Sequence, residues 1–182
     1  MGSDGGDISA SPHRPLHWYA DQSCYWITGA TLYHAPYFRC DQRKQAFVEE
    51  MLQAAEAWSV DLVGWTLMEH HYHAILRLEH GRSLPRFIGR VHTKTATLMN
   101  REDGRPGRQV WRQYWDTLIR SEGDFWFRIN YMWRNPIKHG FCASPEEWPW
   151  TNLGPLMAEG DKVTRGALER FPAPRKLPGD EW

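Results

Sequence analysis

Hydrophobic and polar positions follow two different periods along this chain, and the two periods separate strands from helices. Four short runs rich in aromatic and β-branched residues predict strands at residues 25–33, 60–67, 71–78 and 110–119. Three longer segments repeat their apolar positions every three to four residues, which predicts amphipathic helices at residues 41–58, 84–100 and 122–135. In the first helix the repeating positions, expected to be buried, are Phe47, Met51, Ala54, Ala55 and Trp58.

The order of these elements is β-α-β-β-α-β-α, which indicates an α+β protein. It matches the split βαβ layout of a ferredoxin-like antiparallel sheet with helices on one face. Residues 60–67 and 71–78 are expected to form a hairpin that turns at Glu69 and His70. Asp41, Ser83 and Ser121 are candidate helix caps. Pro136 disfavours helical geometry in the preceding residue, so the third helix is expected to end at Asn135.

Composition and length suggest one domain with tails at both ends. A chain of 182 residues is long enough for a single domain with a substantial core. Residues 1–15 are rich in Gly, Ser and Asp without periodicity, which predicts a disordered N-terminal tail. The domain is expected to span residues 16–153, and residues 154–182 read as a Pro/Gly-rich C-terminal tail.

Charge and cysteine content indicate in which compartment the protein works and which class of partner it binds. The three cysteines are widely spaced and form no disulfide or zinc pattern, which favours a reducing compartment. No apolar run approaches the roughly 20 residues of a membrane-spanning helix, and the N-terminus lacks the apolar region of a signal peptide. We therefore expect a soluble cytoplasmic protein with no membrane partner. The net charge is zero, but residues 82–120 carry nine basic and three acidic residues, a local excess suited to a polyanion.

The strand at residues 71–78 opens with two candidate metal ligands. Residues two apart in a strand point to the same face, so His71 and His73 present neighbouring imidazoles while Tyr72 points away. Neutral imidazoles are common metal ligands, although two histidines packed in a hairpin would show the same pattern. A third ligand is required. Candidates are the amide oxygen of Asn135, which suits Mg²⁺ or Mn²⁺, and Glu69 if the strand begins early enough to include it.

A tyrosine in the third predicted helix is the candidate nucleophile. Tyr131 and Asn135 are four residues apart and therefore share one face of the helix. A phenol with a pKa of roughly 10 is a poor nucleophile at neutral pH, so a nearby metal ion or base has to assist it. The alternative is an ordinary half-buried helix tyrosine. A chemical role requires that this face meets His71 and His73.

A basic row on the second predicted helix is the candidate contact for phosphates. Its members recur every four residues with almost no acids between them: Arg82, Arg86, Arg90 and Lys94. A solvated helix face is the alternative, but such faces usually carry ion pairs at this spacing. Trp111 and Trp115 bracket Arg112, and these rings suit either stacking on bases or packing in the core.

Taken in order, these motifs resemble those of the HUH single-strand transposases, and within them the REP-associated tyrosine transposases. The His-x-His motif corresponds to residues 71–73, and the tyrosine before an Asn-Pro-x-Lys-x-Gly segment corresponds to Tyr131 and residues 135–140. Residues 110–116 and 148–152 are similar to flanking segments of the family, and the likeness covers about residues 25–153. Two departures are Glu69-His70, where the family often has Pro-Asn, and the bulky Tyr72 between the histidines.

The resemblance implies a function. His71, His73 and Asn135 would bind Mg²⁺ or Mn²⁺, and Tyr131 would attack a phosphate of single-stranded DNA, giving a 5′-phosphotyrosine link and a free 3′-OH. The partner would be single-stranded DNA with hairpin-forming repeats, the REP-like palindromes. The enzyme would act as a monomer or homodimer in the cytoplasm, associated with the nucleoid. The basic row, Arg112 and Lys138 would contact the DNA.

Two other functions remain open on the residues alone. One is a catalytically inactive hairpin- or nucleic-acid-binding protein derived from such an enzyme, which would bind DNA in a salt-sensitive way without cleaving it. The other is a metal-dependent hydrolase of small phosphoesters, which would not need the basic row.

Overall fold

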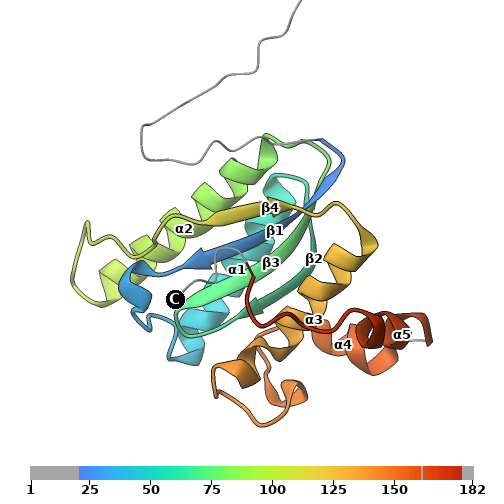
Figure 1. Ribbon diagram of the computed structural model, residues 1–182. Coiled ribbons are helices and arrows are strands. Elements are labelled where there is room, and N and C mark those ends of the chain that lie inside the picture. The colour runs from blue at the N-terminus through green and yellow to red at the C-terminus, as the bar shows by residue number, and fades with distance from the viewer. Residues whose placement is uncertain (1–20, 161, 178–182) are drawn as a thin grey trace, which may run out of the picture.

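The computed structural model describes residues 21–160 and 162–177, which form a four-stranded antiparallel sheet with helices on both faces (Figure 1). The strand order is β2-β3-β1-β4, with β1 (Ser23–Ala30), β2 (Val60–Leu67), β3 (His71–Leu78) and β4 (Trp115–Leu118). The helices are α1 (Asp41–Ala57), α2 (Ser83–Glu102), α3 (Glu122–Lys138), α4 (Leu153–Glu159) and α5 (Lys162–Arg170), with short 3₁₀ turns η1 (Leu32–His34) and η2 (Pro145–Glu147). The α+β class and the antiparallel sheet are confirmed. The expected N-terminal tail lies outside the described residues.

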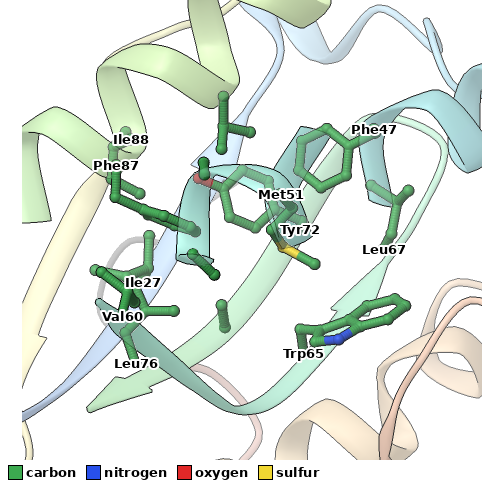
Figure 2. Packing of buried hydrophobic residues seen from close by; sticks show 14 of the residues in the cluster. Ile27, Phe47, Met51, Val60, Trp65, Leu67, Tyr72, Leu76, Phe87 and Ile88 are labelled. Atoms are coloured by element: carbon green, nitrogen blue, oxygen red, sulfur yellow. The ribbon is translucent and has the colours of Figure 1, made fainter. Parts of the chain in front are cut away.

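Helices α1 and α2 cover one face of the sheet, whereas α3 packs on the other, so the expectation that the helices share one face is wrong. Figure 2 shows the core beneath α1 and α2, where Phe47 and Met51 from α1 and Phe87 and Ile88 from α2 meet Tyr72 from β3. All five side chains are at most 1% exposed. This core is the main source of stability, since each fully buried large apolar side chain contributes about 1.5–3 kcal/mol relative to exposure.

Helix α3 packs on the opposite face of the sheet and forms a second, smaller core there. Trp26 and Ile75 point to this face from β1 and β3, and they cluster with Ile129 and Met132 of α3. Alternation along β1 explains the two cores, because Trp26 faces α3 while Tyr25 and Ile27 face α1 and α2. The sheet is thus sandwiched, and α3 brings its own side chains to the face that carries His71 and His73.

The β2–β3 hairpin has the predicted bounds, whereas the other two strands are shorter than predicted. β1 ends at Ala30 because the chain turns into η1, where Tyr33 has a left-handed backbone with a φ of 56°. The run 110–119 contributes only β4, although residues before it still follow β1. Arg112 N donates to Ala30 O at 2.9 Å, and Leu32 N donates to Val110 O at 2.7 Å.

The prediction that α3 ends at Asn135 is wrong, because the helix continues through Pro136 to Lys138. A proline removes one backbone donor, but the next turn is held by other bonds. His139 N donates to Asn135 O at 3.1 Å, and Phe141 N donates to Pro136 O at 2.9 Å. Asn135 and Pro136 are both buried, so packing on the sheet also offsets the local preference. At the other end, Ser121 caps α3 as expected by accepting from Asp124 N at 3.1 Å. Asp41 and Ser83 are instead the first helical residues of α1 and α2, so those two cap predictions are wrong.

Residues after Leu153, expected as a Pro/Gly-rich tail, include the helices α4 and α5. Leu156, Met157 and Leu168 pack against the α3 core, which gives this segment an apolar side despite its charged composition. Asn130 on α3 donates to the carbonyl oxygens of Leu168 and Phe171 at 3.0 and 3.1 Å. Within the described ranges, no helix combines the length and apolar character needed to cross a membrane.

Candidate active site

The two histidines of β3 lie side by side in the interior, under α3. Both are fully buried, and their ring centroids are 4.9 Å apart. Tyr72 between them points to the other face, where its ring centroid lies 5.0 Å from that of Phe47. The predicted alternation is therefore confirmed, and the histidine pair faces α3.

Each histidine is oriented by a polar neighbour from another element. Thr28 on β1 pairs directly with His73, and its Oγ1 lies 3.0 Å from His73 Nδ1. Asn135 on α3 places its Oδ1 3.0 Å from Nε2 of His71. Thr28 and Asn135 are themselves buried, at 0% and 1% exposure. These contacts fix the imidazole rings in a site shielded from water.

Tyr131 lies one helical turn before Asn135 and reaches the same histidine pair. Its ring centroid is 5.6 Å from that of His73 and 6.2 Å from that of Trp26, which in turn stacks on His73 at 4.7 Å. The hydroxyl accepts a hydrogen bond from Nζ of Lys138 at 2.5 Å. The face of α3 that carries Tyr131 and Asn135 therefore meets His71 and His73, which is the condition for a chemical role.

Burial sets the protonation states in this site. Desolvation lowers the pKa of His71 well below its usual range, and the neighbouring His73 adds to the effect. Desolvation likewise lowers the pKa of His73, with further contributions from His139 and Lys138. The pKa of His139 falls to about 4 for the same reason, and burial also lowers the pKa of Lys138. The imidazoles are thus neutral at physiological pH, the state in which they bind metals.

The basic row does not lie at this site. Helix α2 packs in the core on the opposite face of the sheet from Tyr131. Within the row, Arg90 pairs with Glu50 of α1 at 2.7 Å and Arg86 lies over the ring of Trp58 at 5.2 Å. The spacing within α2 could not show the ion pair of Arg90, because its acidic partner Glu50 belongs to α1. Arg82 and Lys94 are exposed.

Two predicted groups beside β1 have different surroundings. Arg112 is exposed next to β1. Burial lowers the pKa of His34, and the charge of Arg112 adds to this effect. Of the two tryptophans that flank Arg112, Trp111 is buried and stacks on His92 at 4.2 Å, so that ring belongs to the core. Trp115 is 44% exposed.

Comparison with known proteins assigns the chain to a family. The model of the family described as IS200-like transposases matches residues 21–117, more than half of the chain. The chain belongs to the IS200-like transposase family. Transposases of this kind cleave DNA strands and transfer them, so the protein belongs to a family of enzymes. The matched range includes both histidines of the site but not Tyr131.

Relatives of this IS200-like transposase agree with the assignment. The REP-associated tyrosine transposase of Escherichia coli is 23% identical over 148 residues, which cover 75% of this chain and 84% of that protein. A relative from Haemophilus influenzae is 28% identical over 81 residues, covering 44% of this chain and 42% of that protein. A solved structure described as a REP-associated tyrosine transposase bound to a REP hairpin shares the fold, with a TM-score of 0.68 and 17% identity. It covers 95% of this chain and 98% of that one.

Membership of the IS200-like transposase family implies a divalent metal cofactor. The nitrogen and oxygen donors at this site suit such an ion. Among the described residues, no cluster of three His, Cys, Asp or Glu side chains is placed to hold a metal ion. Asn135 offers a side-chain amide oxygen beside the histidine pair. Two ligands of one octahedral Mg²⁺ are about 3 Å apart, and Nε2 of His71 and Oδ1 of Asn135 are 3.0 Å apart. Because Nδ1 of His73 contacts Thr28, a metal would bind that ring through Nε2.

Glu69 does not join this donor set. It was a candidate only if the strand included it, but β3 begins at His71 and Glu69 lies in the turn. Its carboxylate pairs with Arg39 at 3.4 Å instead. Strand β2 ends at Leu67, before Glu69. Side chains in the turn therefore no longer alternate between the two faces of the sheet.

Three residues of the site were missed by sequence reasoning. Thr28 and Trp26 come from β1, 43 or more residues before the histidines, and His139 follows α3 with its ring centroid 4.8 Å from that of His71. The alternation of β1 was visible, but only the pairing of Thr28 with His73 shows that the two side chains meet. No local spacing encodes that register.

Proposed function

We propose that this protein cleaves and rejoins single-stranded DNA near hairpins, through a covalent 5′-phosphotyrosine intermediate on Tyr131. The observation that carries the proposal is the meeting of Tyr131 and Asn135 of α3 with His71 and His73 of β3 in one buried site. A phenol, two neutral imidazoles and an amide oxygen have no reason to converge for packing alone. Together they provide a nucleophile and three donors for a metal ion.

In the cleavage step, Oη of Tyr131 forms a bond to the scissile phosphorus while the bond from phosphorus to the 3′ oxygen breaks. The phenol loses its proton, and the departing 3′ oxygen gains one to become a 3′-OH. Lys138 donates to Oη at 2.5 Å, which stabilises the phenolate form. Attack by a 3′-OH of another DNA end on the same phosphorus reverses the step, so joining needs no ATP.

His71, His73 and Asn135 would hold Mg²⁺ or Mn²⁺. When bound, such an ion polarises a phosphate oxygen and favours ionisation of the phenol. The protein supplies the dry, fixed surroundings. Trp26 covers His73 and its edge contacts Tyr131, which restricts both rings.

The DNA is proposed to be a hairpin of the REP type. The E. coli relative is named for REP association, and the structural neighbour is described as bound to a REP hairpin. Lys138 contacts the hydroxyl of Tyr131, and Arg112 is exposed next to β1. Both would contact the strand that is cut. The basic row of α2 lies on the other face of the sheet from the site. It would contact more distant phosphates of a bound hairpin through Arg82, Arg86, Arg90 and Lys94.

The direct test is adduct formation with end-labelled hairpin DNA from the flanks of the gene. With Mn²⁺ the wild-type protein should give a protease-sensitive, slowly migrating band on a denaturing gel, and EDTA should abolish it. Tyr131→Phe should bind the same DNA and give no adduct. Phe127→Tyr serves as a matched aromatic control on α3, because Phe127 is 37% exposed and belongs to neither apolar cluster. An adduct that persists in Tyr131→Phe would remove Tyr131 from the mechanism.

One observation favours the second candidate, an inactive hairpin-binding protein. Tyr131 is only 2% exposed, and Lys138 lies against its hydroxyl and ring. Ala173 and Leu177 also pack against the cluster that contains Tyr131. A nucleophile so covered has to be uncovered before DNA reaches it. Salt-sensitive hairpin binding by the wild type without any adduct in Mg²⁺ or Mn²⁺ would select this function.

A further inference from the structure

Trp115 is an exposed aromatic residue at the edge of the sheet. Of the tryptophans in the described part of the chain, it is the one that is exposed rather than buried or half-buried, at 44%. It opens β4, which forms one edge of the sheet (Figure 1). The other strand-borne tryptophans, Trp26 and Trp65, are at most 9% exposed. A large apolar ring on an edge strand exposes surface that water solvates poorly, which marks it as a contact candidate.

The strand register places Trp115 on the same face as the active site. Trp115 pairs directly with Thr28, and Thr28 pairs directly with His73. Directly paired residues of neighbouring antiparallel strands point to the same side. Trp115, Thr28 and His73 thus form one row across three strands, ending at the open edge. Residues of the other parity on β4 confirm the assignment, since Leu118 packs in the core on the α1 and α2 side.

The charge around this edge suits a nucleic acid strand. Arg112 precedes Trp115 by three residues and Arg120 follows it by five, and both are exposed. Arg112 is held beside β1 by its backbone bond to Ala30. Proteins that bind single strands combine such cations, which track phosphates, with aromatic rings on which bases stack.

We propose that Trp115 is a stacking platform for one unpaired base of the DNA strand that enters the active site. The ligand is the π face of a nucleobase close to the scissile phosphate, with Arg112 near the adjoining backbone. This proposal rests on the proposed function and deepens it. Stacking is tolerant of sequence because every base has a π face, so the platform would position the strand rather than select its sequence.

The core does not account for the exposure of this ring. Ile119, two positions after Thr117 on the same side of the strand, packs against the α3 core, whereas Trp115 belongs to neither apolar cluster. Its removal is therefore expected to leave folding nearly unchanged. A smaller residue would satisfy the strand equally well, and the size of the indole is explained by a ligand.

The test compares Trp115→Leu and Trp115→Phe with wild type for binding of single-stranded hairpin oligonucleotides in EDTA, which separates binding from cleavage. Leucine keeps an apolar side chain and removes the π face, while phenylalanine keeps a ring. Trp115→Leu should weaken binding about 5- to 150-fold, and Trp115→Phe should recover most of it. A series of oligonucleotides with one abasic site stepped along the unpaired strand then locates the base. At the stacked position, wild type and Trp115→Leu should bind equally well.

Leu52→Ala is the matched control, because Leu52 is 52% exposed on α1, on the other side of the sheet. It should leave binding unchanged. Equal affinity of wild type and Trp115→Leu for every oligonucleotide, with adducts still formed, would overturn the platform and leave the proposed function standing. Failure of the wild type to bind single-stranded hairpins at all would overturn both. An equal loss for all abasic positions would also refute a single stacked base.

Discussion

Gly29→Ala is expected to destabilise the fold severely, because Gly29 lies directly opposite Tyr72 in the β1–β3 pairing. A Cβ built at Gly29 would lie 2.2 Å from Cε1 and 2.7 Å from Cζ of the Tyr72 ring. Ordinary contact begins at 3.4 Å, so the ring or the strand has to move by more than about 1 Å. The methyl group itself is small, and the cost arises from what holds the ring.

Tyr72 has little freedom to retreat. It is 1% exposed, its hydroxyl lies 3.1 Å from Nε2 of His92, and its ring packs on Phe47 and Trp111. Overpacking a rigid core costs about 1–3 kcal/mol and sometimes more, and this contact belongs at the upper end. For a chain of this size, a loss of about 3 kcal/mol corresponds to a fall in Tm of about 6–12 °C. Because Tyr72 lies between the two site histidines, its displacement should also weaken metal binding.

The assay is chemical denaturation followed by circular dichroism, with Gly89→Ala as the control. Gly89 lies within α2, and a Cβ added there would meet nothing within 4 Å, so alanine at this position should stabilise by about 0.5–1 kcal/mol. In a double-mutant cycle, Tyr72→Leu removes the atoms that clash, so the cost of Gly29→Ala should shrink in that background. A Gly29→Ala protein within about 0.5 kcal/mol of wild type would refute the reasoning.

Four further predictions concern the site and its supports. Thr28→Val removes the hydroxyl beside His73, so Mn²⁺ affinity measured by calorimetry should fall about 10- to 100-fold; unchanged affinity would contradict the orienting role. Asn135→Ala should abolish the Mn²⁺-dependent adduct on denaturing gels while hairpin binding persists, and a normal adduct would exclude the amide as a donor. Ser121→Ala removes the cap of α3 and should lower the free energy of unfolding, measured in urea, by about 1 kcal/mol. An unchanged free energy would show that the cap does not stabilise the helix. The depressed pKa values of His71 and His73 mean that the unfolded chain binds more protons as the pH falls below about 6.5, so Tm without metal should drop from pH 7 to pH 5. Replacing both histidines with glutamine should reduce this dependence of Tm on pH. An equal dependence in the variant would show that the two histidines do not cause it.

Local pattern was sufficient for the elements that pack in the ordinary way. The β2–β3 hairpin and the presentation of His71 and His73 on one face follow from strand alternation alone. The shared face of Tyr131 and Asn135 follows from helical spacing, and the cap at Ser121 follows from its short polar side chain. These properties depend on backbone geometry within a few residues, which is why the sequence determines them.

Tertiary structure decided which of these faces meet. Only the β1–β3 register brings Thr28 to His73, and only the packing of α3 on the sheet keeps the helix intact through Pro136 and places Asn135 at His71. The same sheet separates the basic row from the site and exposes Trp115 while burying Trp111. Contacts between residues far apart in the chain depend on how whole helices and strands pack together. The spacing of residues within one element does not specify that packing.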